Sequence, residues 1–323
     1  MTDRVTRLAP SPTGALHLGN VRTFLINWAA ARQAGWRVVL RLEDLDGPRV
    51  KPEASAQAID LLQWLGMDWD GDPLTQSDDL SPYADAVAAL RDRDLVYPCP
   101  ATRSEIEAAA LSAPHADDHE LRYPNLYRPP PEDFTAGPKI PPDTPTALRF
   151  VVPDGPVSFT DERLGPQSVD VQQQVGDFVV QTKAGLPAYQ LAVVVDDARQ
   201  AVTDVVRGDD LLRSTARQQL LYDALQLQPR PRYWHVPLVL GPDGRRLAKR
   251  HGDTRAAAYR EQGVPAERLI GLMAWWCGVT DERKPMDAAA FAGLFDWAKL
   301  PPDPVTFTPE DDAWLTQPAA HSA

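Results

Sequence analysis

The first hundred residues alternate short apolar runs with a stretch whose apolar positions recur every three or four residues. Residues 5–8 and 37–42 are apolar and rich in β-branched side chains, which predicts two strands. Between them, apolar side chains at i, i+3, i+4 and i+7 over residues 21–28 predict one buried face of a helix, and Gly35 stands where a helix C-cap belongs. A strand, a loop, a helix and a strand form a βαβ unit, so we expect a parallel sheet.

The rest of the chain continues this alternation around one irregular segment. Eight prolines lie between residues 123 and 145, which predicts an extended insertion because proline removes backbone donors and blocks helix interiors. Apolar runs over residues 189–195 and 202–207 indicate further buried segments. The pattern predicts four further helices, over residues 52–65, 81–90, 214–225 and 265–276. Ser214 is expected to cap the third of these helices, and the fourth is expected to be the last in the chain. Strands are predicted over residues 147–152, 236–240 and 245–248.

These elements predict an α/β fold of the nucleotide-binding type. An insertion divides this fold into two parts. We expect the two parts of the catalytic domain over residues 1–98 and 147–250, with the insertion over residues 99–146. Residues 251–323 are expected to form a short helical segment and an acidic tail. In open parallel sheets, ligands bind beyond the carboxyl ends of the strands, where the strand order reverses. The loop after the first strand is therefore the first place to seek a site.

Composition excludes several classes of protein. The chain has 323 residues, of which 43% are hydrophobic, and none of its apolar runs reaches the roughly 18 residues that a membrane span needs. Its first residues lack the layout of a secretion signal. Cys99 and Cys277 are too few for a disulfide framework. We therefore expect a cytoplasmic protein that has no membrane partner and is a monomer.

Charge is unevenly distributed along the chain. The net charge is −12, which is unusual for a nucleic-acid-binding protein. Residues 228–260, however, hold eight basic and two acidic side chains, whereas residues 281–323 hold eight acidic and three basic ones. The basic block is a candidate contact surface for a polyanion. A solvated surface remains the alternative interpretation.

The loop after the first strand has features of a phosphate site. Residues 7–20 read RLAPSPTGALHLGN, and a helix that begins near His17 directs unpaired backbone N–H groups and its positive dipole end at a bound anion. Gly19 permits close approach to the backbone, and His17 can donate to phosphate oxygens. An ordinary turn is the alternative for these residues taken alone.

A second candidate element lies late in the chain. Residues 245–252 read RRLAKRHG, which places Lys249 in a loop followed by glycine. A flexible ammonium group suits the shifting charge of phosphoryl or nucleotidyl transfer. An exposed basic turn is the alternative.

Taken together, these elements resemble the class I aminoacyl-tRNA synthetases, whose signatures are His-x-Gly-His/Asn and Lys-Met-Ser-Lys-Ser. The second signature is loosely matched, because only its inner lysine is kept. The blocks RLAPSPTG, RLEDLD, GLPAYQLAVVVDD and VVRG resemble the glutamyl branch, and the likeness covers residues 4–276. It implies a Rossmann-type catalytic domain. The matching signature residues are His17, Leu18, Gly19 and Asn20, then Arg246, Leu247, Ala248, Lys249 and Arg250.

The resemblance also implies two substrates, L-glutamate and ATP, the latter with Mg²⁺. Guanidinium forks suit the side-chain carboxylate of glutamate, and a carboxylate suits its ammonium group. Surface ion pairs and core packing are the alternatives for these side chains. Implied for glutamate are Arg7, Ala9, Ser11, Glu43, Tyr189 and Arg207. Implied for ATP are Pro10, His17, Gly19, Asn20, Leu247 and Lys249, of which His17, Asn20 and Lys249 are the catalytic ones.

Within this branch, the chain resembles the truncated paralogues. Too few residues follow Lys249 for the helical anticodon-binding domain of the full-length enzymes, and Val193 replaces an asparagine that those enzymes commonly carry. The truncated paralogues activate glutamate without tRNA and attach it to queuosine at the wobble position of tRNA(Asp), which implies the anticodon loop as partner. A minimal glutamyl-tRNA synthetase and a glutamyl-adenylate donor to a non-tRNA acceptor are the alternatives.

The insertion departs from these paralogues. Many of them bind zinc there through Cys-x-Cys and Tyr-x3-Cys, but here only Cys99 and Tyr123 match. Because tetrahedral zinc needs about four ligands, we expect a degenerate site without metal. His115 and His119 lie between the two and are the alternative source of ligands.

Overall fold

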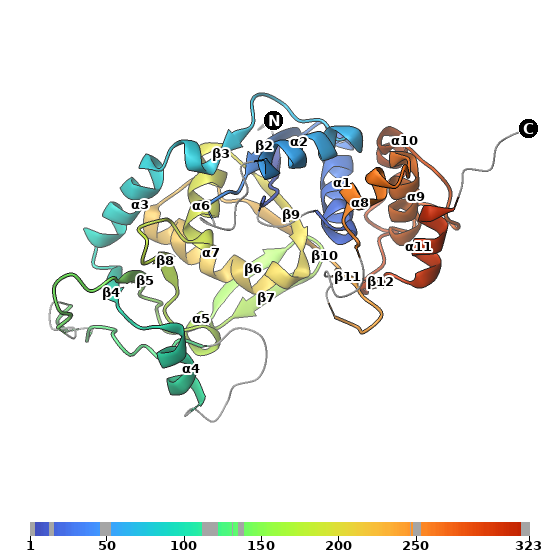
Figure 1. Ribbon diagram of the computed structural model, residues 1–323. Coiled ribbons are helices and arrows are strands. Elements are labelled where there is room, and N and C mark those ends of the chain that lie inside the picture. Colours follow the sequence, from blue (N-terminus) through green and yellow to red (C-terminus); the bar gives the residue numbers. More distant parts are fainter. Residues whose placement is uncertain are drawn as a thin grey trace, which may run out of the picture. The chain divides into compact units, whose positions relative to one another are not determined.

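The computed structural model describes residues 4–12, 16–45, 53–111, 122–130, 132–134, 139–245, 247 and 253–317 (Figure 1). The chain divides into two compact units. The first comprises Met1–Gln76, Val202–Leu211 and Pro231–Ala323, and the second comprises Ser77–Ala201 and Leu212–Arg230. The domain boundaries expected from the sequence stay a prediction.

The first unit begins with the predicted βαβ arrangement. Strand β1 (Val5–Leu8) pairs in parallel with β2 (Arg37–Leu42), and β2 pairs in parallel with β3 (Leu74–Thr75). Helix α1 (Leu18–Gln33) connects β1 to β2, and Gly35 after it has a φ of 67°, which glycine adopts without steric cost. The predicted strands, helix and cap are confirmed.

The other side of β1 faces a segment from late in the chain. Strands β9 (Asp204–Gly208) and β10 (Arg232–Val236) pair in parallel. The N–H group of Thr203, just before β9, donates to the carbonyl of Val5 at 2.8 Å, and the N–H group of Val5 donates to Oγ1 of Thr203 at 2.8 Å. Since β2 and β9 lie on opposite sides of β1, the strand order reverses at β1. A ligand is therefore expected at the carboxyl ends of β1 and β9.

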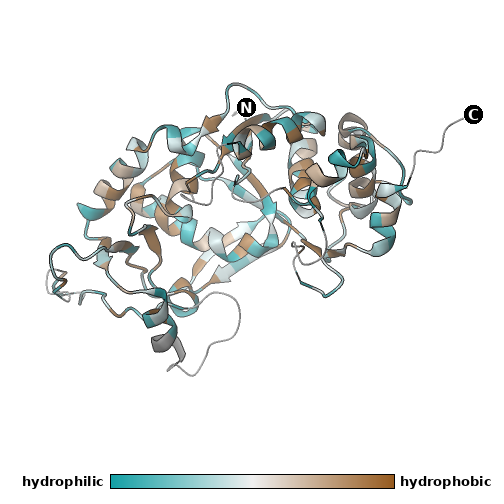
Figure 2. Cartoon of the chain, viewed as in Figure 1, coloured by the Kyte–Doolittle hydropathy of each residue, from teal (hydrophilic) through white to brown (hydrophobic). Residues whose placement is uncertain are grey.

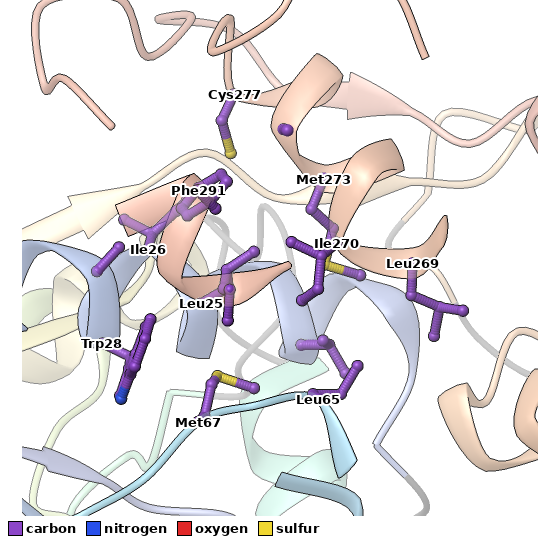
Figure 3. Close-up of a cluster of buried hydrophobic side chains, with 14 of the residues drawn as sticks. Leu25, Ile26, Trp28, Leu65, Met67, Leu269, Ile270, Met273, Cys277 and Phe291 are labelled. Carbon is purple, nitrogen blue, oxygen red and sulfur yellow. The ribbon is translucent and has the colours of Figure 1, made fainter. Parts of the chain in front are cut away.

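The main hydrophobic core of the first unit lies between helices (Figure 3). Leu25 and Ile26 of α1 are fully buried, as are Leu269 and Met273 of α9 (Ala266–Trp276) and Phe291 of α10 (Ala288–Leu294). Burying each such side chain contributes about 2 kcal/mol by transfer from water. This core holds α1, and with it the loop before α1, against the C-terminal helices.

The C-terminal part is more regular than its sequence predicts. Helix α9 confirms the prediction over residues 265–276, but the expectation that it is the last helix is wrong, because α10 and α11 (Pro309–Thr316) follow it. The side chain of Thr308 caps α11, and Asp311 completes a capping box. Both helices are short, and their periodicity is weak because alanine and acidic residues fill many positions. Also in this unit are α2 (Ala54–Trp64), α8 (Ala256–Glu261), and β11 (Val239–Leu240) paired in parallel with β12 (Val305–Thr306).

The second unit contains an antiparallel sheet, a hairpin and several helices. Strands β4 (Val96–Cys99), β5 (Ala147–Phe150) and β8 (Val179–Gln181) pair in the order β4-β5-β8, and β6 (Val157–Asp161) pairs with β7 (Gly165–Val169). The helices are α3 (Ser81–Arg91), α4 (Arg103–Leu111), α5 (Val171–Gln174), α6 (Tyr189–Arg199) and α7 (Leu212–Leu225).

Ser214 does not cap α7. The helix begins two residues earlier, and the Ser214 hydroxyl lies inside it, where it accepts hydrogen bonds from Gln190 at 3.1 Å and Arg217 at 2.9 Å. Sequence alone favours serine as a cap, and here a buried polar contact takes its place.

Most helices carry both hydrophilic and hydrophobic residues (Figure 2). In the part of the chain that the structure describes, none of the helices has the length and apolar character needed to cross a membrane.

One buried carboxylate links the start of β1 to β10. Asp204 begins β9 and is fully buried, and it accepts hydrogen bonds from Arg4 Nε at 2.8 Å and Trp234 Nε1 at 3.3 Å. Arg232 lies 3.2 Å from it. Burial alone would raise the pKa of Asp204, but the hydrogen bonds from Arg4 and Thr203 outweigh it and hold the pKa below its ordinary value of 3.8.

Replacing Asp204 by asparagine is expected to lower the free energy of unfolding by about 3 kcal/mol near neutral pH, because the arginines lose a buried partner. Since folding lowers this pKa, the stabilisation is present above pH 3.8 and is lost as the pH falls through the folded-state value. Urea unfolding of wild type and D204N across this range checks the prediction, with the exposed Asp303→Asn as control. An equal loss at every pH would contradict it.

Candidate active site

The carboxyl ends of β1, β2 and β9 bring predicted site residues to one edge of the sheet. Arg7 is buried in β1, and its Nη1 donates to the carbonyl of Val206, next to Arg207, at 3.4 Å. The N–H group of Glu43, directly after β2, donates to the carbonyl of Pro10 at 3.0 Å. A cationic and an anionic group therefore flank the same loop after β1. Ala9 and Ser11 in this loop are half-buried.

Helix α1 begins at this loop, and His17 is its N-cap. Nδ1 of His17 accepts hydrogen bonds from the N–H groups of Gly19 at 3.1 Å and Asn20 at 3.3 Å, while Oδ1 of Asn20 accepts from the N–H group of His17 at 3.3 Å. Because Nδ1 accepts, a neutral His17 ring carries its proton on Nε2. The signature residues thus form a capping box that selects the tautomer able to donate from Nε2.

Gly19 leaves room for the His17 ring. A Cβ atom at this residue would lie 3.0 Å from Cε1 and 3.1 Å from Nδ1 of His17. A methyl group there would push the imidazole by a few tenths of an ångström and weaken the cap. The signature spacing therefore has a steric reason in this fold.

The resemblance described above implies adenylate formation with ATP. On that basis, replacing Gly19 by alanine is expected to reduce the rate of ATP–pyrophosphate exchange about tenfold, since sub-ångström displacement of a positioned group is costly. Gly293→Ala is the matched control, because a Cβ at this helical position in α10 meets nothing within 4 Å. Exchange assays on both variants, with circular dichroism to monitor folding, check the prediction. Equal rates in the two variants would rule out the steric argument.

Two buried side chains hold α1 in place. Nδ2 of Asn27 donates to the carbonyl of Arg7, and Oδ1 of Asn27 accepts from the hydroxyl of Thr6, both at 2.8 Å. The fully buried Arg22 donates to the carbonyl of Pro237 at 2.6 Å. Helix α1 is therefore tied both to β1 and to the segment between β10 and β11.

A buried arginine of β2 positions the Glu43 side chain. Arg41 is fully buried in β2, and its Nη2 donates to Oε1 of Glu43 at 3.1 Å. The Glu43 side chain remains partly exposed at 12%. A carboxylate held from behind in this way can accept hydrogen bonds from a bound ammonium group.

Arg207 also has a close neighbour on the next strand. It is buried in β9, its Nε donates to Nε2 of His235 in β10 at 3.0 Å, and its Nη2 donates to the carbonyl of Leu211 at 3.2 Å. These bonds orient the guanidinium group.

The remaining predicted site residues come from other segments of the chain. Tyr189 is the first residue of α6 in the second unit, and it is 43% exposed; Val193 of the same helix is buried. Leu247 has a buried side chain, and its N–H group donates to the carbonyl of Val239 at 3.1 Å. Arg246, Ala248, Lys249 and Arg250 lie outside the described residues, and so do Pro52, His115 and His119. The sequence predicts a strand over residues 245–248. Arg245, at the start of this range, does not belong to a strand in the structure.

Much of the basic block is paired with acidic side chains. Four of its arginines form ion pairs, while Arg245 is exposed. The contact surface for a polyanion that this block predicts stays a prediction. The pairs are Arg230–Asp223, Arg232–Asp204, Arg255–Asp253 and Arg260–Asp60.

The two matches to the zinc motif bond to each other. Sγ of Cys99 lies 3.3 Å from Oη of Tyr123, which also accepts from the N–H group of Tyr127 at 3.1 Å. Burial raises the pKa of Tyr123, and the contact with Cys99 raises it further. Among the described residues, no group of three or more His, Cys, Asp or Glu side chains is arranged to hold a metal ion.

Sequence reasoning missed the supporting residues Asn27, Arg41 and His235. A detectable signal existed for two of them, since Arg41 and His235 are polar positions inside otherwise apolar strand runs. Burial of such residues requires a partner. Arg41 meets Glu43 only two residues away, whereas His235 meets Arg207 because β10 pairs with β9.

The chain belongs to the class I aminoacyl-tRNA synthetases of the glutamyl and glutaminyl type. Residues 4–301 match the family described as tRNA synthetases class I (E and Q), catalytic domain. This membership confirms the predicted Rossmann-type α/β fold and the assignment to a ligase family.

Particular relatives narrow the resemblance. The Glutamyl-Q tRNA(Asp) synthetase of Rhodopirellula baltica is 51% identical over 84% of each chain, and that of Symbiobacterium thermophilum is 44% identical over 96% of this chain and 98% of the relative. The glutamate–tRNA ligase of Pelobacter propionicus is 37% identical over 98% of this chain and 66% of the relative. The crystal structure of glutamate-tRNA synthetase from Elizabethkingia anophelis superposes with a TM-score of 0.80 at 28% identity, covering 97% of this chain and 70% of that one.

Proposed function

We propose that this protein activates L-glutamate with ATP in the absence of tRNA and transfers the glutamyl group to queuosine at the wobble position of tRNA(Asp), in the cytoplasm. The observation that carries the proposal is the gathering of Arg7, Glu43 and Arg207 at the carboxyl ends of neighbouring strands, beside the N-terminus of α1. Two guanidinium groups suit the side-chain carboxylate of glutamate, and Glu43 suits its ammonium group. The resemblance also assigns Ala9, Ser11 and Tyr189 to glutamate.

The first step is formation of glutamyl-adenylate. The α-carboxylate of glutamate attacks the α-phosphorus of ATP, an oxygen–phosphorus bond forms, and the bond to the departing pyrophosphate breaks. Negative charge shifts onto phosphate oxygens, so positioned donors supply most of the catalysis. His17 Nε2 and Lys249 are the proposed donors, and the positive end of the α1 dipole adds electrostatic attraction. Pro10, Gly19, Asn20 and Leu247 are proposed to line the nucleotide.

Mg²⁺ is proposed to arrive with ATP, where it neutralises phosphate charge. The described residues offer no three-membered cluster of His, Cys, Asp or Glu for a metal.

The second step is acyl transfer. A hydroxyl of the queuosine diol attacks the activated carboxyl carbon, an ester bond forms, and AMP leaves. Support for this acceptor comes from the relatives: identity is 44–51% to two enzymes named Glutamyl-Q tRNA(Asp) synthetase and 37% to a named glutamate–tRNA ligase. The second candidate function, charging of a tRNA 3′ end, is favoured by that 37% identity and by the fold shared with glutamyl-tRNA synthetases.

Transfer of labelled glutamate tests the proposal. Purified protein receives ATP, labelled glutamate and tRNA(Asp) with or without queuosine, and ribonuclease fragments locate the label. Pyrophosphate exchange without tRNA is measured beside it. We expect exchange without tRNA and label only on the queuosine-containing anticodon fragment. Label on a 3′-terminal fragment would establish the second candidate, and exchange without any tRNA labelling would direct the search to other acceptors.

A further inference from the structure

His235 of β10 is a fully buried polar residue that the proposed chemistry does not use. It lies opposite Arg207 in the parallel pairing of β9 and β10, so the two side chains share one face of the sheet. Nε of Arg207 donates to Nε2 of His235 at 3.0 Å. Arginine has donors and no acceptor, so Nε2 must present a lone pair. His235 is therefore a neutral imidazole in this contact.

The guanidinium group of Arg207 makes two further contacts. Nη2 of Arg207 donates to the carbonyl of Leu211 at 3.2 Å, and the guanidinium carbon lies 5.1 Å from the centre of the Tyr233 ring. The Tyr233 and His235 rings are stacked at 6.2 Å with 11° between their planes. The Tyr233 ring stacks against the imidazole of His235. His235 in turn accepts a hydrogen bond from the Nε edge of the Arg207 guanidinium group.

We propose that His235 is a positioning residue that orients Arg207 for the side-chain carboxylate of glutamate. A guanidinium group binds a carboxylate best in one plane, through two parallel hydrogen bonds. An acceptor that engages Nε on the next strand fixes this plane before substrate arrives, which reduces the ordering cost of binding. This inference rests on the proposed function, because it assigns Arg207 to glutamate.

The test compares glutamine and leucine at residue 235. Glutamine in H235Q offers an oxygen acceptor near the position of Nε2, whereas leucine in H235L has similar bulk and no acceptor. We expect the KM for glutamate in pyrophosphate exchange to rise about tenfold in H235L, as befits an unpaired buried donor. The KM for ATP and kcat should change less than threefold. H235Q should retain the wild-type KM within about threefold.

A double-mutant cycle separates positioning from a general structural role. In the R207K background, H235L should alter the glutamate KM less than threefold, because the Nε donor is gone. Thermal unfolding of each variant reports folding, and H235A replaces H235L in the comparison if H235L does not fold. Equal glutamate KM values for H235Q and the apolar variant, or additive effects in the cycle, would overturn the inference.

Calorimetric titration with L-glutamate distinguishes failure of the His235 inference from failure of the proposed function. Weaker glutamate binding in the apolar variant than in H235Q supports the role of His235. If wild type binds glutamate and all variants bind it equally, the His235 inference fails alone. If wild type binds no glutamate, the proposed function fails and the inference with it.

Discussion

Replacing Lys249 by alanine is expected to lower the maximal rate of ATP–pyrophosphate exchange by about 10²- to 10³-fold, the cost typical of losing one donor to developing charge. The KM for glutamate should change less than threefold. The reason is that the lysine ammonium group is proposed to follow charge on the phosphates of ATP, whereas glutamate is proposed to bind through Arg7, Glu43 and Arg207. Steady-state exchange kinetics with each substrate varied in turn measures both quantities.

Lys284→Ala is the matched control for this experiment, since it removes an exposed lysine near the C-terminal helices. Exchange in this variant should equal that of wild type. If K249A exchanged pyrophosphate at the wild-type rate, Lys249 would have no part in adenylate formation. A large rise in the glutamate KM with unchanged maximal rate would move the residue to the amino-acid site.

Replacing Glu43 by glutamine is expected to raise the KM for glutamate about 100-fold, because a partly buried charge pair with the substrate ammonium group is lost. The effect extends to stability. Arg41 is fully buried and donates to Oε1 of Glu43 at 3.1 Å, so E43Q removes one charged partner of a buried cation. The free energy of unfolding should fall by about 3 kcal/mol. Exchange kinetics and urea unfolding of the same preparation measure the two effects.

Glu53→Gln removes the same charge from an exposed residue whose side chain makes no cap hydrogen bond at the start of α2. It should change neither the glutamate KM nor stability. Addition of 100-fold more glutamate should restore most of the activity of E43Q. Loss of activity that excess glutamate does not relieve would assign Glu43 a role beyond substrate binding.

Local signals were sufficient for the elements that carry the first part of the site. The apolar spacing of residues 21–28 and the strand runs around them predicted β1, α1 and β2, and the structure has all three. The loop sequence predicted a helix that begins near His17, and the structure adds that His17 is its N-cap. Where such signals were weak, as in α10 and α11, the sequence underestimated the order of the chain.

The supporting contacts behind the site required the folded chain. Arg207 and His235 are 28 residues apart, and the pairing of β9 with β10 places them opposite each other. Arg260 similarly pairs with Asp60, 200 residues earlier in the chain, a partner that no local pattern indicates. A charged residue in a sequence indicates that a partner is needed, but it does not identify that partner.

The amino-acid order alone was enough to specify the family, the βαβ unit and the identity of most candidate ligands, because motifs and periodicity are properties of short segments. Tertiary packing was needed to set β9 beside β1, where Thr203 bonds to Val5 across 198 residues, and so to bring Arg207 to the edge that holds Arg7 and Glu43. The free energy that places two distant strands side by side comes from burying the whole core, to which residues throughout the unit contribute. No short segment contains that information.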